Sequence, residues 1–169
     1  MTDESATDQA GMQGKNGGPP LGFGKGVHEY LGHYVDVADT KIGVLTGLAL
    51  AVLGFLLTKN TSSLPLDLAK WIGVGSEIVA IAAGAFALYP RLTSGGGSPI
   101  FWEDVSSRDG AIRYFEDLEK LDDIAVEREY ALQNYYLSQI LHRKYYGVRI
   151  GMAAFLAGSA MAALVIVLA

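Results

Sequence analysis

Three long uncharged stretches constrain the fold of this chain more than any other feature of its sequence. The last of them, residues 150–169, is IGMAAFLAGSAMAALVIVLA and contains no charged side chain. A helix of about 20 apolar residues is long enough to cross a hydrocarbon core of about 30 Å. A surface helix of a small soluble protein would show a polar face, and this stretch has none. The sequence therefore predicts a transmembrane helix over residues 150–169.

Two further blocks predict the same kind of helix. Residues 42–58, IGVLTGLALAVLGFLLT, are short for a span, but Lys41 and Lys59 flank them and can extend toward the headgroups. Residues 71–90, WIGVGSEIVAIAAGAFALYP, carry aromatic side chains near both ends, where membrane interfaces concentrate them. The predicted fold class is an all-α membrane protein with three transmembrane helices and a helical segment between the second and the third.

The segments outside these blocks differ in character. Residues 1–26 are rich in glycine, proline and small polar residues without a hydrophobic period, which predicts a disordered tail. Residues 27–40 place apolar side chains at helical spacing and predict an interfacial helix leading into the first span. Within residues 91–149 we expect helices separated near residues 121–123, the last of which continues into the third span. Residues 27–169 are thus expected to form one membrane domain.

Lysine and arginine near the span ends predict the orientation of the chain. The short connection 59–70 carries only two lysines, whereas the long connection 91–149 begins with Arg91 and closes with HRKYYGVR. The basic residues of that closing sequence are Arg143, Lys144 and Arg149. We therefore place the N-terminal tail and residues 91–149 in the cytoplasm, and the 59–70 turn and the C-terminus outside.

Composition and spacing disfavour several classes of chemistry. The chain has no cysteine, which excludes disulfides, thiol catalysis and cysteine-ligated metals. Its histidines, His28, His33 and His142, form no paired-ligand spacing, so no metal site is predicted. There is neither a Walker-type phosphate loop nor a nucleophile elbow, and the acidic residues of 116–129 are interpreted as a solvated helix face. The net charge of −5 does not favour nucleic-acid binding. We expect no catalytic residues, no cofactor and no enzyme activity.

One ionisable residue, Glu77, lies inside the second apolar block, about two helical turns from its start. An ionisable group at such a depth is costly and often functional, and in an oligomer it would line a polar path. If the span instead starts later than residue 71, Glu77 lies near the outer interface. The sequence leaves both alternatives open.

Small residues recur every four positions in the first and third blocks. Gly43 and Gly47 form a GxxxG pattern in the first, and Gly158 lies within such a series in the third. These strips let helices approach closely, either within one chain or between chains. We expect a homo-oligomer, although the pattern does not distinguish the two kinds of contact.

The stretch YPRLTSGGGSPIFWEDVS, residues 89–106, follows the second block. Consecutive backbone N–H groups in a glycine-rich turn can bind an anion, and nearby hydroxyls, a basic residue and a stacking aromatic would suit a nucleotide phosphate. The candidate residues here are Arg91, Ser94, Gly96, Ser98 and Trp102. The competing interpretation is a flexible juxtamembrane turn whose aromatic residues anchor at the headgroups.

The order of several pieces resembles the Pycsar transmembrane effector family of bacterial antiphage systems. These pieces are HEYLGHYVDVADTKIGVLTGLALAVLGFLL at residues 28–57, YPRL at 89–92, SPIFWEDV at 98–105 and YYLSQILHRKYYGVRIG at 135–151. The resemblance covers roughly residues 27–169. It implies a membrane effector of antiviral defence in the bacterial inner membrane.

The resemblance also implies a signal and a partner. In such systems a pyrimidine cyclase makes cyclic CMP or cyclic UMP on infection, and the effector impairs the membrane, which ends in abortive infection. The nucleotide would then be an activating ligand. This chain shows no separate nucleotide-binding domain, so recognition would use residues 91–149. There Arg91, Arg143 and Lys144 are either phosphate partners or topology-setting charges.

Two other functions remain open at the level of the sequence. One is a constitutive pore-forming or holin-like toxin that another protein restrains. The other is a membrane scaffold whose cytoplasmic helix recruits partners without any leak.

Overall fold

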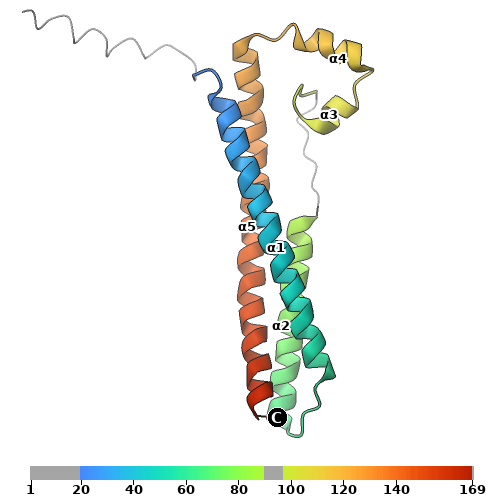
Figure 1. The fold of residues 1–169 in the computed structure, drawn as a ribbon, viewed down its shortest axis with the longest axis vertical. Coiled ribbons are helices and arrows are strands. Elements are labelled where there is room, and N and C mark those ends of the chain that lie inside the picture. The colour runs from blue at the N-terminus through green and yellow to red at the C-terminus, as the bar shows by residue number, and fades with distance from the viewer. Residues whose placement is uncertain (1–19, 90–96, 169) are drawn as a thin grey trace, which may run out of the picture. The chain divides into compact units, whose positions relative to one another are not determined.

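The computed structural model describes residues 20–89 and 97–168, and within these ranges the secondary-structure elements are all helices, joined by turns and short connections (Figure 1). The long helices are α1 (Phe23–Thr58), α2 (Leu64–Leu88) and α5 (Asp123–Leu168), and the short ones are α3 (Trp102–Ser106) and α4 (Ala111–Leu118). Among the helices of the described residues, α1, α2 and α5 are the ones long and apolar enough to cross a membrane. The prediction of an all-α membrane protein with three apolar helices is therefore confirmed for the described residues.

Helix α1 is continuous over 36 residues and includes both the expected interfacial helix and the first apolar block. Neither glycine nor proline interrupts the boundary Thr40-Lys41-Ile42, so nothing in the local sequence ends the helix there. At 1.5 Å per residue the helix is about 54 Å long, well beyond the thickness of a hydrocarbon core. Part of α1 must therefore lie outside the apolar layer. Its first turn also includes residues 23–26, which the sequence assigned to a disordered tail.

Helix α2 begins before the apolar block that predicted it. Ser63 precedes the helix with an extended backbone, and a proline, Pro65, follows in the first turn. Proline is favoured in the first helical turn because its fixed φ suits the helix and its missing N–H group has no intrahelical partner there. The helix thus starts at Leu64 instead of residue 71, and it ends at Leu88.

The break between α4 and α5 lies where the sequence predicted it. Helix α4 ends at Leu118 and α5 begins at Asp123. The Asp122 carboxylate accepts a hydrogen bond of 2.7 Å from the Ala125 N–H, as an aspartate before a helix often does. From Asp123 the helix runs without interruption into the third apolar block, which also agrees with the sequence prediction.

The chain divides into two compact units. The membrane unit comprises Tyr30–Thr93 and Tyr136–Ala169 and holds all three apolar blocks. The polar unit comprises Met1–Glu29 and Ser94–Tyr135, and its described part holds the start of α1, helices α3 and α4, and the first third of α5.

Glycines set the packing of the membrane unit, where α1, α2 and α5 lie side by side (Figure 1). A Cβ atom at Gly147 of α5 would lie 2.7 Å from the Ala87 Cβ of α2, and one at Gly84 of α2 would lie 2.4 Å from the Thr46 hydroxyl of α1. Larger residues at these positions would force the helices apart. Close packing of this kind is what holds helices together in lipid, where burial of apolar surface gives no advantage over contact with acyl chains.

Candidate functional site

The described end of the glycine-rich stretch is held by a cluster of three buried polar residues, Ser98, Asp104 and Gln133, which we call the Ser98 cluster. The Ser98 N–H donates to Asp104 Oδ2 at 3.0 Å, which ties the loop to α3. The Ser98 hydroxyl accepts a hydrogen bond of 3.1 Å from Gln133 Nε2 of α5. These bonds satisfy buried polar atoms, and an unpaired one would be costly. The backbone at Ser98 is therefore fixed from two helices.

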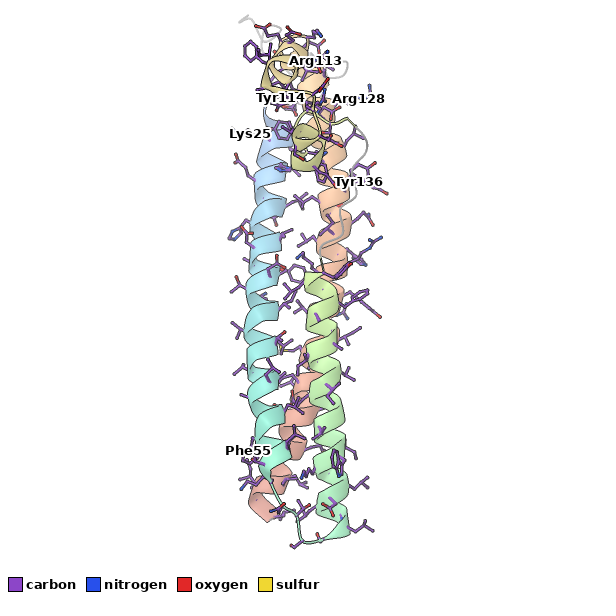
Figure 2. All side chains as sticks on the ribbon, turned by 90° about the vertical axis from the view of Figure 1, so that its right-hand side faces the viewer. Lys25, Phe55, Arg113, Tyr114, Arg128 and Tyr136 are labelled. Atoms are coloured by element: carbon purple, nitrogen blue, oxygen red, sulfur yellow. The ribbon has the colours of Figure 1, made fainter. Side chains whose placement is uncertain are left out.

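Two further side chains hold the residues on either side of Ser98. The Arg108 guanidinium donates to the Gly97 carbonyl and to the Asp117 carboxylate, each at 2.7 Å. Tyr114, labelled in Figure 2, lies on α4. Its hydroxyl donates to the Pro99 carbonyl at 2.7 Å. Gly97 has a φ of 84°, in the left-handed region that favours glycine. Residues 97–99 thus have a defined conformation in the polar unit.

A second polar contact in the same unit joins the first turn of α1 to α5. The backbone N–H groups of Gly22 and Gly24 both donate to the Glu127 carboxylate, the latter at 2.8 Å. The Gly24 carbonyl accepts a hydrogen bond of 2.8 Å from Asn134 Nδ2. His28 Nδ1 lies 3.2 Å from Asn134 Oδ1. We call this group the Glu127 clamp: Gly22, Gly24, His28, Glu127 and Asn134.

The position of the Glu127 carboxylate is favoured by the partial positive charge at the N-terminus of α1. The free N–H groups of a first turn give a helix N-terminus partial positive charge, so a carboxylate is stabilising there. Glu127 is buried, and the two backbone donors compensate for its lost hydration. A Cβ atom at Gly24 would lie 2.7 Å from both Glu127 Oε2 and the Tyr130 Cβ, so glycine is needed for this approach.

The interpretation of residues 116–129 as a solvated helix face is wrong for Glu127. Its side chain points into the clamp because the start of α1 supplies donors for it. Sequence reasoning also missed Asp104 and Gln133 of the Ser98 cluster. The contacts of Glu127 link residues more than 100 positions apart, and no local sequence pattern predicts them.

Several residues predicted to bind a nucleotide lie outside the described part of the chain. These are Arg91, Ser94 and Gly96, together with the side chain of Trp102, whose backbone begins α3. Ser98 lies in the polar unit, within the Ser98 cluster. Their contribution to binding stays a prediction.

The other two predicted residues, Arg143 and Lys144, lie on α5 in the membrane unit. Arg143 is exposed, whereas Lys144 forms an ion pair with Asp39 of α1. The Lys144 side chain is only 14% exposed and already has a counter-charge. Its charge therefore stabilises the contact between α1 and α5, whatever else it binds.

Glu77 lies midway along α2 and is completely buried. Neither of its carboxylate oxygens has a hydrogen-bond partner. The helix begins at Leu64 and so does not start later than residue 71. A Cβ atom at Gly158 of α5 would come within 2.3 Å of Glu77 Oε1, so glycine at that position makes the space for the carboxyl group.

The glycines of the GxxxG pattern behave differently from Gly158. Gly43 and Gly47 are exposed, and no atom lies within 4 Å of a Cβ placed on either. They therefore do not pack within the described part of the chain, whereas Gly158 packs against α2. A contact of Gly43 and Gly47 with a second copy stays a prediction.

Ring contacts involve two of the three histidines. His28 takes part in the clamp and lies edge-on to the Tyr130 ring, and His33 lies edge-on to Tyr34. Among residues 20–89 and 97–168 there is no group of three or more histidine, cysteine or acidic side chains that could hold a metal ion.

A family model described as the Pycsar effector protein domain matches residues 24–169. The chain belongs to this family. The match begins within the first turn of α1 and covers the clamp apart from Gly22, the Ser98 cluster and the three apolar helices from residue 24 onward. The comparisons gave no match to a curated protein and none to a solved structure.

Membership of the Pycsar effector family confirms the resemblance inferred from the sequence. It assigns the chain a role as an effector of antiphage defence, distinct from the cyclase of such a system. The family implies a cyclase partner and cyclic nucleotide signalling, and its transmembrane domain agrees with the three apolar helices of a membrane protein.

Proposed function

We propose that this Pycsar effector is activated by a cyclic pyrimidine nucleotide, cyclic UMP or cyclic CMP, and then impairs the inner membrane of the infected bacterium. The family match over residues 24–169 carries this proposal, because the same residues include three helices able to cross a membrane. A partner cyclase supplies the nucleotide on infection. Loss of membrane integrity then ends the infection together with the cell.

Recognition of the nucleotide is assigned to residues 91–149, with Arg91, Ser94, Gly96, Ser98 and Trp102 as the proposed contacts. The Ser98 cluster supports this assignment, since it fixes the backbone directly after the glycine run. Arg143 and Lys144 are proposed as additional phosphate partners. The ligand shifts the population toward the active state only as far as it binds that state more tightly than the resting one.

The proposed orientation places the N-terminus in the cytoplasm and the C-terminus outside. Three spans put residues 20–22 and residues 97–122 on the same side of the membrane, and the Glu127 clamp requires the same, because Gly22 contacts Glu127 directly. The basic residues Arg91, Arg143 and Arg149 favour the cytoplasm for that side. The nucleotide would then reach the polar unit from the compartment in which it is made.

The deciding experiment uses the full-length protein in liposomes loaded with a self-quenched dye. Cyclic UMP, cyclic CMP, cyclic AMP and buffer alone are added in parallel. We expect release with one or both cyclic pyrimidines and none with cyclic AMP. Release under every condition would favour a constitutive pore-forming toxin, and no release under any would favour a scaffold without leak activity.

A pair of variants tests the proposed recognition residues in the same assay. Arg91→Gln removes a proposed phosphate partner and is expected to shift the nucleotide concentration for half-maximal release upward by about tenfold, the effect of roughly 1.4 kcal/mol. Lys59→Gln removes a basic residue from the other connection and is expected to leave that concentration unchanged. Equal responses of the two variants would remove Arg91 from the proposed site.

A further inference from the structure

The membrane unit holds one carboxyl group that its packing leaves without a partner. Glu77 is fully buried at the middle of α2, and both of its oxygens lack a hydrogen-bond partner. Buried polar groups in membrane helices normally pair with one another or with backbone carbonyls, and unpaired ones mark functional positions.

No charge on the packed helices compensates Glu77. Helix α1 carries no titratable residue between Lys41 and Lys59, and α5 carries none after Arg149. On α2 itself the nearest charged residues are Lys70 and Asp67, about 10 Å and 15 Å away along the helix axis. A carboxylate at Glu77 would therefore lie in an apolar setting without a counter-ion.

Glycine residues make the space that the Glu77 carboxyl group occupies. A Cβ atom at Gly158 would lie 2.3 Å, 2.7 Å and 3.0 Å from Oε1, Cδ and Cγ of Glu77. One turn earlier on α2, a Cβ atom at Gly73 would lie 3.5 Å from the Gly158 carbonyl oxygen. The two helices thus meet closely at this point, and the side chain fills the slot without room for a hydration shell.

These observations decide between the ligands that a carboxyl group can take. A desolvated metal cation needs several oxygen ligands, and among the described residues no group of three or more histidine, cysteine or acidic side chains could hold one. An unpaired carboxylate in an apolar interior is far less stable than the neutral acid. Of these ligands, a proton is the one that suits the buried Glu77 carboxyl group.

We propose that Glu77 is a proton-binding site of the membrane unit, neutral while α2 packs against α5, and that loss of the proton separates these helices. The O–H bond breaks, the proton passes to water, and the electron pair stays on the carboxylate. The carboxylate then requires hydration, which the Gly158 slot cannot accommodate. The closed packing is therefore favoured at lower pH and the opened one at higher pH.

The first test identifies the protonated group and does not depend on nucleotide activation. Full-length protein in liposomes is treated with dicyclohexylcarbodiimide, which enters lipid and adds to a carboxylic acid, and the labelled residue is mapped by mass spectrometry. We expect a label on Glu77 that declines as pH rises and is lost in Glu77→Gln. A water-soluble carbodiimide is expected to label acidic residues of the polar unit and spare Glu77. Absence of lipid-soluble label on Glu77 at every pH would overturn the proposal.

The second test measures the separation of the helices. The chain has no cysteine, so spin labels at Ile72→Cys on α2 and Leu156→Cys on α5, both exposed positions, report one distance. We expect this distance to grow with pH in the otherwise unchanged protein and to stay constant in the background of Glu77→Gln, which keeps the shape of the side chain without its charge. The same pH-dependent change in both backgrounds, or none in either, would overturn the role of Glu77 in opening.

Discussion

At the scale of single residues, a few polar side chains matter because of the backbone groups they meet. Glu127 is stable in a buried position because the first turn of α1 supplies two N–H donors. Asp104 of α3 is likewise buried and accepts a hydrogen bond from the Ser98 N–H. Glu77 has no such donor, and this difference separates structural acids from one with a proposed proton-binding role.

The clamp gives a prediction at this scale. Glu127→Gln replaces one acceptor oxygen by an NH₂ group that faces a backbone donor, and should cost about 1–3 kcal/mol of local stability. Amide hydrogen exchange of residues 22–28 should accelerate accordingly. Glu129→Gln, two positions along the same helix and outside the clamp, is the matched control and should exchange like the unchanged protein. Equal protection in both variants would mean that the clamp does not hold the start of α1.

A second residue prediction concerns the seat of Glu77. Gly158→Ala places a methyl group against the carboxyl group and should destabilise the membrane unit by about 1–3 kcal/mol through overpacking. Gly75→Ala, on α2 where no atom lies within 4 Å, should change the stability little. Thermal unfolding in detergent micelles compares the two. If the Gly158→Ala protein is as stable as the Gly75→Ala protein, α5 can move away from α2 without loss of stability.

At the scale of elements, helix α1 has two unlike faces in the membrane unit. Ile42, Leu45, Ala49 and Leu56 are buried within the unit, whereas Gly43 and Gly47 are exposed with open space before them. Helix α5 instead turns Gly147, Gly151 and Gly158 toward its neighbours. The same kind of residue thus packs inside the chain on α5 and remains available for a second copy on α1.

This contrast predicts different results for the same substitution on the two helices. Gly47→Leu should leave the thermal stability within about 0.5 kcal/mol but reduce chemical cross-linking between copies, since close approach of a second α1 is blocked. Gly151→Leu should lower the stability itself, because its side chain would meet Leu45 of α1. If Gly47→Leu cross-links as efficiently as the unchanged protein, the exposed glycines are not the oligomer contact.

At the scale of the whole molecule, the proposed orientation can be tested directly because the chain has no cysteine. Asn60→Cys lies in the connection between α1 and α2, and Glu119→Cys lies between α4 and α5. A membrane-impermeant maleimide added to spheroplasts, in which the inner membrane is intact and accessible, should label Asn60→Cys at once and Glu119→Cys only after permeabilisation. The reverse pattern would place the polar unit outside the cell and exclude a cytoplasmic nucleotide as its signal.

The sequence by itself determined the features that depend on local composition. The length of the apolar blocks predicted three helices able to cross a membrane, and residues 121–123 were predicted to separate two helices, where α5 begins at Asp123. The order of the motifs was enough to predict the family that the comparison confirmed. Helix boundaries were less accurate, since α1 continues through Lys41 and α2 starts at Leu64.

Only the tertiary structure decided which polar residues meet. Glu127 finds its donors at Gly22 and Gly24, and Gln133 finds the Ser98 hydroxyl, through contacts between residues 35 to 105 positions apart. The burial of Glu77 within the membrane unit likewise depends on Gly158, a residue on another helix. Hydrophobic periodicity reports which face of a helix is apolar. It carries no information about which distant residues lie opposite that face, and the polar contacts of this protein are made with such residues.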